Sequence, residues 1–217
     1  MSNVAPARLQ ESASQWTSGR AIWTVLSVAL GTIATYFVFR YASRYLEYTP
    51  IAYRPYWDVR WSIIFHVLGG LVALALGPLQ FWTRLRQRRP AIHRLLGRFY
   101  LGGILVGSVA ALHLILFHSR PAFGIPLLGL NMVWVTSAGM ALVAIRFRNI
   151  QQHREWMIRS YVATYAFVVF RLLLDVPALR ALGPQQGITI AWLCWAVPLF
   201  CTEIMLQWRR VVAKQRV

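Results

Sequence analysis

The sequence predicts an all-α membrane protein, a polytopic bundle of about six transmembrane helices with a four-helix core. Hydrophobic residues make up 58% of the 217-residue chain and charged residues only 13%, whereas about 25% of a soluble domain is charged. The apolar residues fall in blocks of roughly 20, the length that a helix needs to cross the hydrocarbon layer. Arginines gather in the short connections between these blocks, as membrane topology requires.

Six segments are long and apolar enough to cross a membrane. The fifth is the shortest and least apolar, because it contains Arg159 and Arg171. The six run approximately from Arg20 to Arg40, Val59 to Trp82, Arg98 to His118, Ile125 to Ile145, Met157 to Leu174 and Ile188 to Trp208.

A single membrane domain with two tails is the predicted organisation. Residues 1–19 are polar and rich in Ser, Ala and Gln, which predicts a disordered tail. Residues 20–208 hold the six helices, and the four core helices lie within residues 59–174. Residues 209–217 form a short basic tail.

The distribution of basic residues predicts the orientation. About two thirds of the 23 Arg and Lys residues fall in the tails and alternate connections on one side of the membrane. The positive-inside rule makes that side cytoplasmic. We therefore expect a multi-pass protein of the inner (plasma) membrane with both termini in the cytoplasm.

The formal net charge of +17 raises the question of nucleic-acid binding. The arginines, however, lie between apolar blocks, where topology and anionic lipid account for them. We expect membrane lipids as partners and no nucleic acid. Nothing in the sequence points to an oligomeric state.

One motif occurs twice. Two segments share the order His-Arg, a short spacer, Arg, any residue and Tyr, and they begin at His93 and His153. Each enters a predicted helix from the basic side. Two related helical hairpins would produce this pattern, as in some transporters, and so would chance.

These motifs, with residues in the neighbouring helices, resemble a family of predicted bacterial membrane proteins, domain-of-unknown-function family 2306. The resemblance covers roughly residues 60 to 175 and implies a multi-helix membrane core without an agreed activity. It rests on His66, Gly77-Pro78-Leu79-Gln80-Phe81, His93-Arg94-x-x-Gly97-Arg98-x-Tyr100, His153-Arg154-x-Trp156-Met157-x-Arg159-Ser160-Tyr161 and Arg171.

Two histidines inside predicted helices are candidate haem or metal ligands. Counted from the outer ends of their helices, His66 and His113 lie at similar depth. Two neutral imidazoles at one depth could ligate a haem iron from both sides. Gly70 and Ala73 would leave space below His66. The alternative for His66 is a neutral imidazole hydrogen-bonded to a neighbouring helix.

His118 is an alternative partner for His66, closer to the membrane surface, and only one of His113 and His118 can face it. The second hairpin has Asn131 and Trp134 at the matching depth. A symmetric protein with two haems is therefore not predicted.

The two motif histidines form a second candidate site at the basic interface. His93 and His153 could bind a metal or a second haem, or contact lipid phosphates or quinone head groups. The alternative is that these His-Arg pairs only anchor the helices at the interface. The arginines that would neutralise haem propionates are Arg94, Arg98, Arg154 and Arg159.

Two classes of function remain open. One is a haem-b-binding electron-transfer protein with a bis-histidine site, with a quinone or other redox partner. The other is a non-catalytic interaction, lipid-handling or assembly factor, and a transporter ranks third. The sequence contains no phosphate loop, zinc-protease motif, nucleophile elbow or dinucleotide fingerprint. It therefore assigns no enzymatic reaction and no cofactor other than haem.

Overall fold

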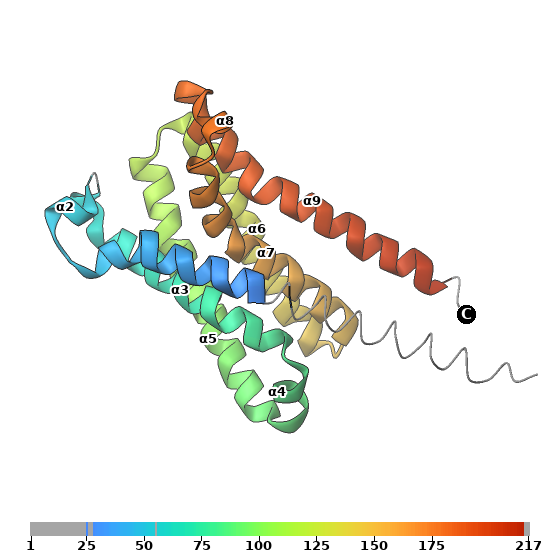
Figure 1. Ribbon diagram of the computed structural model, residues 1–217. Helices are drawn as coiled ribbons and strands as arrows, with labels where there is room; N and C mark the ends of the chain where they lie inside the picture. Colours follow the sequence, from blue (N-terminus) through green and yellow to red (C-terminus); the bar gives the residue numbers. More distant parts are fainter. Residues whose placement is uncertain (1–24, 26–27, 55, 215–217) are drawn as a thin grey trace, which may run out of the picture. The chain divides into compact units, whose positions relative to one another are not determined.

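The computed structural model describes residues 25, 28–54 and 56–214 (Figure 1). The chain divides into two units, Met1–Ser43 and Arg44–Val217. In the first unit, residues 28–37 are helical and continue into η1 (Val38–Ala42). The predicted tail lies outside the described residues, and the first predicted span lies partly outside them.

Five long helices of the described residues are apolar enough to cross a membrane. They confirm the predicted all-α polytopic bundle and five of its spans, and the described residues contain no strand. The long helices are α3 (Arg60–Phe81), α5 (Pro90–His118), α6 (Pro121–Arg146), α7 (Ile150–Leu174) and α9 (Gln186–Lys214). Three short elements precede α3: η2 (Ser43–Leu46), α2 (Pro50–Tyr53) and η3 (Trp57–Val59). Short elements between the long helices are α4 (Thr83–Arg88), α8 (Pro177–Arg180) and η4 (Gly183–Gln185).

Two helices begin about two turns earlier than the hydropathy predicts. α5 begins at Pro90, which occupies the first helical turn, where a missing N–H costs nothing. α7 begins at Ile150, after Asn149 caps it by accepting a hydrogen bond from the Gln152 N–H at 3.1 Å. Hydropathy reports the segment inside hydrocarbon, whereas the hydrogen-bonded helix continues beyond it. His93 and His153 therefore lie on helices.

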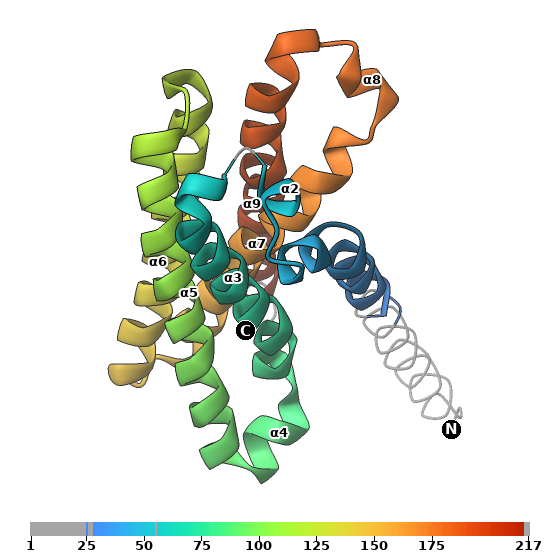
Figure 2. The ribbon, with the colours of Figure 1, turned by 90° about the vertical axis from the view of Figure 1, so that its left-hand side faces the viewer.

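The second unit is an up-and-down bundle (Figures 1 and 2). Neighbouring helices pack in the order α3, α5, α6, α7 and α9, and α9 also packs against α6. We call the end that holds α4 and residues 147–149 the basic end, and the end that holds Ser119 and Arg120 the opposite end.

The core of this unit extends beyond the four predicted core helices. Cys194 of α9 is buried among residues of α5, α6 and α7. Ile190 and Ala191, one turn earlier, are fully buried as well. α9 therefore packs into the bundle, because its small and branched residues face α6 and α7.

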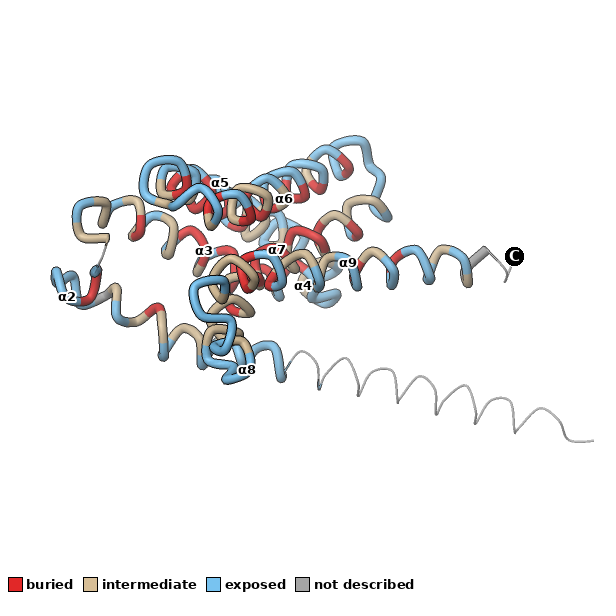
Figure 3. The backbone as a smooth tube through the Cα atoms, turned by 90° about the horizontal axis from the view of Figure 1, so that it is seen from above, coloured by how far each residue is buried: buried red, intermediate tan, exposed pale blue. Residues whose placement is uncertain are grey.

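Figure 3 shows buried residues where the helices face one another and exposed residues on the outer surfaces. The outer surface is strongly apolar: Phe117 is 71% exposed and Phe200 66%. The contacts between helices instead use many small residues, among them Ala73, Ala138 and Ala166. Small residues inside and large apolar ones outside are typical of helices surrounded by lipid.

Glycines bring α3 and α5 into backbone contact. A Cβ added to Gly69 would lie 2.5 Å from the Gly103 carbonyl oxygen and 2.6 Å from the Gly107 nitrogen. A Cβ on Gly103 would lie 2.8 Å from the Gly69 oxygen. No ligand can pass between the two helices at this level.

Candidate cofactor site

His153 is held on the first turns of α7 by a neighbouring helix. Its Nδ1 lies 2.8 Å from the Ala141 carbonyl oxygen of α6. Because a carbonyl only accepts, Nδ1 donates this hydrogen bond, and Nε2 is the ring nitrogen that a ligand could engage. Metal-ligating histidines commonly have this arrangement, in which a backbone carbonyl orients the ring.

His93, on the first turns of α5, has a buried Nδ1 without a hydrogen-bond partner. The charges that act on its ring come from Arg86 of α4 and from His153. Both motif histidines thus lie on the first turns of their helices, at the basic end of the bundle. An unpaired buried ring nitrogen is costly unless a ligand engages it.

Gln80, near the end of α3, is a third polar residue at the basic end, and it was not among the predicted site residues. Its side chain is buried, and its Nε2 has no hydrogen-bond partner. Its Oε1 lies 3.3 Å from where a Cβ of Gly97 would be. Gly97 follows His93 by about one turn of α5 and lies on the same face. The only sequence signal for Gln80 was its place in an apolar motif.

Buried hydroxyl groups join α5, α6 and α7 further along the helices from His93 and His153. The Tyr100 hydroxyl lies 2.8 Å from the Ser160 hydroxyl, and the Trp134 indole N–H donates to Thr164 at 2.8 Å. Thr164 also donates to the Ser160 carbonyl at 2.9 Å. This network fixes α5 against α7, and so fixes the helices that carry the two histidines.

Three of the four predicted propionate-binding arginines remain available. Arg94, Arg98 and Arg154 are exposed on α5 and α7 at the basic end. Arg159 is not available, because its Nε and one terminal nitrogen donate to Glu203 of α9 at 2.5 and 2.9 Å. Its other terminal nitrogen lies 3.9 Å from the buried carboxylate of Glu155.

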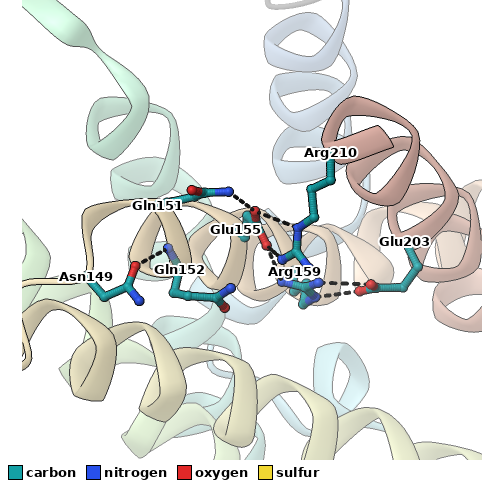
Figure 4. Close-up of polar contacts among 7 residues, drawn as sticks. All are labelled: Asn149, Gln151, Gln152, Glu155, Arg159, Glu203 and Arg210. Carbon is teal, nitrogen blue, oxygen red and sulfur yellow. Dashed lines mark hydrogen bonds and ion pairs between the residues drawn. The ribbon is translucent and has the colours of Figure 1, made fainter. Parts of the chain in front are cut away.

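Figure 4 shows Arg159 between these two carboxylates, with Arg210 of α9 directed at Glu155. Gln151 also donates to Glu155, at 3.3 Å. Two of the 6 acidic residues of the chain therefore lie in one cluster of ion pairs between α7 and α9. Glu155 could not be singled out from the sequence, because Arg210, which joins it to α9, lies 55 residues away along the chain. The role of the cluster is to attach α9.

The other predicted pair, His66 and His113, lies along the contact between α3 and α5. Nδ1 of His66 is 3.0 Å from the Gly107 carbonyl oxygen, so this nitrogen donates across the helices. Nδ1 of His113 is 3.0 Å from the Ser62 hydroxyl. His113 is exposed, with its ring centroid 5.5 Å from that of His118, which is exposed as well.

This pair does not fit a haem. The two helices touch through their backbones about one turn below His66, so no macrocycle fits between them. The space expected below His66 is filled: a Cβ on Gly70 would lie 3.4 Å from the Phe167 ring, and that ring packs against His66 at 5.6 Å. Ala73 is completely buried. The geometry matches the alternative for His66, an interhelical hydrogen bond.

The donor set at the basic end is compatible with a haem. Among the described residues, no group of three or more His, Cys, Asp or Glu side chains comes together. Two imidazoles alone suit a group that brings its other metal ligands with it, as a porphyrin does. The unpaired nitrogen of His93 and the free Nε2 of His153 are such donors.

Comparison with known proteins agrees with the membrane fold. A family described as "Predicted membrane protein (DUF2306)" matches residues 63–206, which extends the resemblance noted above through most of α9. No curated protein and no solved structure matches the chain. Because the family match covers more than half of the chain, including both His-Arg motifs and the ion-pair partner Glu203, this protein belongs to the DUF2306 family of predicted membrane proteins.

Proposed function

We propose that this protein is a membrane redox protein that holds haem b between His93 and His153 at the basic end. The support for the proposal is that the histidines of the two repeated motifs both lie on the first turns of their helices at the basic end, and that each has a ring nitrogen without a hydrogen-bond partner. The pair His66 and His113 has the same imidazole chemistry, but α3 and α5 leave no space for a haem there.

Each residue has a definite part in this proposal. His93 and His153 supply one ring nitrogen each, and the Ala141 carbonyl keeps His153 in the required tautomer. The exposed guanidinium groups of Arg94, Arg98 and Arg154 pair with the propionates. A bound haem would supply one-electron transfer through its iron.

The test is the absorption spectrum of the purified full-length protein. We expect a Soret band and sharp reduced α and β bands, which His93→Ala and His153→Ala each reduce by at least about tenfold because bis-histidine ligation is lost. His113→Ala is the matched control, since that imidazole is exposed. His66→Ala should also keep the spectrum. Loss of the Soret band in His66→Ala would instead favour a haem site at His66 and His113. Wild-type protein without haem would leave the lipid-handling, interaction or assembly role.

We also propose that the basic end faces the cytoplasm, with both termini there and the protein in the inner (plasma) membrane. The support is the concentration of arginine at the basic end, which includes Arg86, Arg88, Arg94 and Arg98. Anionic lipid of the cytoplasmic leaflet would stabilise this orientation.

Cysteine labelling in intact cells tests the orientation. Single cysteines at Arg88 and at Arg120 are introduced into a chain with Cys194→Ala and Cys201→Ala. A membrane-impermeant maleimide should label position 120 and should label position 88 only after lysis. Equal labelling of both positions in intact cells would contradict the proposed topology.

A further inference from the structure

We infer that the end of α3 at Gln80 binds the head group of a membrane quinone, with the Gln80 amide donating to a quinone carbonyl. The side chain of Gln80 is only 7% exposed, and its Nε2 has no hydrogen-bond partner. A buried N–H without an acceptor destabilises a protein, most of all where no water replaces the bond. A ligand oxygen at this position would satisfy the amide.

The Gln80 carboxamide is held in place by the neighbouring helix α5. Gln80 reaches α5 at Gly97, where a Cβ would come within 3.3 Å of Oε1 and crowd it. The carboxamide is therefore held at the contact between α3 and α5, with its Nε2 still unpaired.

Aromatic rings beside Gln80 indicate the class of ligand. Phe81 packs against Tyr161 of α7 with ring centroids 5.9 Å apart, and Tyr165 lies 6.2 Å beyond Tyr161. Flat rings attract one another in stacked and edge-to-face arrangements. A neutral amide donor next to an aromatic cluster suits a neutral ring with carbonyl oxygens, which is a quinone.

The route of entry is from the bilayer. Phe81 is 39% exposed and Trp82 54%, although both follow a buried polar residue in sequence. Apolar aromatic groups exposed at the end of a membrane helix contact lipid. A ligand dissolved in the membrane can therefore reach the end of α3 without crossing water.

The quinone would be the electron partner of the proposed haem, and to that extent the inference rests on the proposed function. Binding itself is argued from Gln80 and the aromatic rings beside it and needs no haem. The two ideas can therefore fail separately.

The experiment uses full-length protein in phosphatidylcholine nanodiscs, titrated with decylubiquinone. The readout is saturable quenching of tryptophan fluorescence by the quinone. Trp82, two residues after Gln80, is the tryptophan next to the proposed site. We expect Gln80→Leu to weaken quinone binding at least about tenfold, because a bond to a buried amide is lost. Without quinone, Gln80→Leu should raise the melting temperature by about 2–4 °C, because the unpaired amide is gone. If Gln80 had only a structural role, Gln80→Leu would lower the melting temperature.

Gln207→Leu is the matched control, since Gln207 is exposed on α9; it should change neither quinone binding nor the melting temperature. Gly97→Ala, which crowds the Gln80 carboxamide, should also weaken binding. Wild-type protein without saturable quenching, or Gln80→Leu with wild-type affinity, would overturn the inference. So would competition by phosphatidylglycerol, which would assign the site to an anionic lipid head group.

The same samples separate this inference from the proposed function. A Soret band retained by Gln80→Leu together with lost quinone binding supports both. Quinone binding by protein without haem supports the inference and overturns the haem. A haem spectrum without quinone binding supports the haem and overturns the quinone site.

Discussion

Gly69→Ala is expected to lower the free energy of unfolding by about 3 kcal/mol, the upper end of the usual cost of overpacking. The new Cβ would meet the Gly103 oxygen at 2.5 Å and the Gly107 nitrogen at 2.6 Å. Both atoms belong to a helix backbone, so neither can move aside as a flexible side chain would. The helices must separate, and the hydrogen bond from His66 to the Gly107 carbonyl lengthens with them.

Unfolding in detergent micelles, followed by tryptophan fluorescence, measures this effect. Gly102→Ala and Gly139→Ala are matched controls, because a Cβ at either position meets nothing within 4 Å. Both should raise stability by roughly 0.5–1 kcal/mol, since alanine restricts the unfolded chain. If Gly102→Ala lowered the free energy of unfolding as much as Gly69→Ala, the α3–α5 contact would not be the cause of the destabilisation.

Arg159→Met is expected to cost about 1.5–3 kcal/mol, the range for hydrogen bonds to charged groups. The cost stays below that of a fully buried ion pair because the Glu203 side chain is 39% exposed. Glu155 is only 7% exposed, and Glu203 would lose both of its bonds to the Arg159 guanidinium. The attachment of α9 to α7 should weaken most, and limited proteolysis should then cut within the second half of α9.

Two further variants make the test specific. Arg180→Met removes an ion pair with Asp175 whose side chains are more than half exposed, and should cost at most about 1 kcal/mol. Arg159→Met combined with Glu155→Gln and Glu203→Gln should recover part of the loss, because no carboxylate remains unpaired. Equal costs for Arg159→Met and Arg180→Met would contradict the assignment of the α7–α9 contact to these ion pairs.

Membrane class was predictable because hydropathy is a property of short segments. Each apolar block must form a helix in hydrocarbon, whatever its neighbours do. The ends of the helices were less predictable. Pro90 and Asn149 start helices outside the apolar blocks, through backbone geometry and a side-chain cap. Both signals are local and can be found in sequence when helix caps are considered together with hydropathy.

The candidate site was predictable only in part. The repeated motif singled out His93 and His153, and the fold brings them to one end of the bundle. Gln80 lacked any periodic signal, because a single amide in an apolar run reads as an isolated polar residue. Glu155 and Glu203 are separated by 48 positions, and each alone resembles an ordinary interfacial carboxylate.

The sequence by itself determined the membrane class and five spans of the described bundle, because these depend on the composition of short segments. Only the tertiary structure decided which faces of the helices meet. Counting residues put His66 and His113 level, whereas in the bundle His66 bonds to Gly107 and His113 lies against Ser62. The backbone contact at Gly69 also leaves no space for a macrocycle between the helices. The same packing placed Arg159 between two carboxylates and left Gln80 and His93 with unpaired buried nitrogens. Which side chains face each other is a property of helix packing, and no single segment contains it.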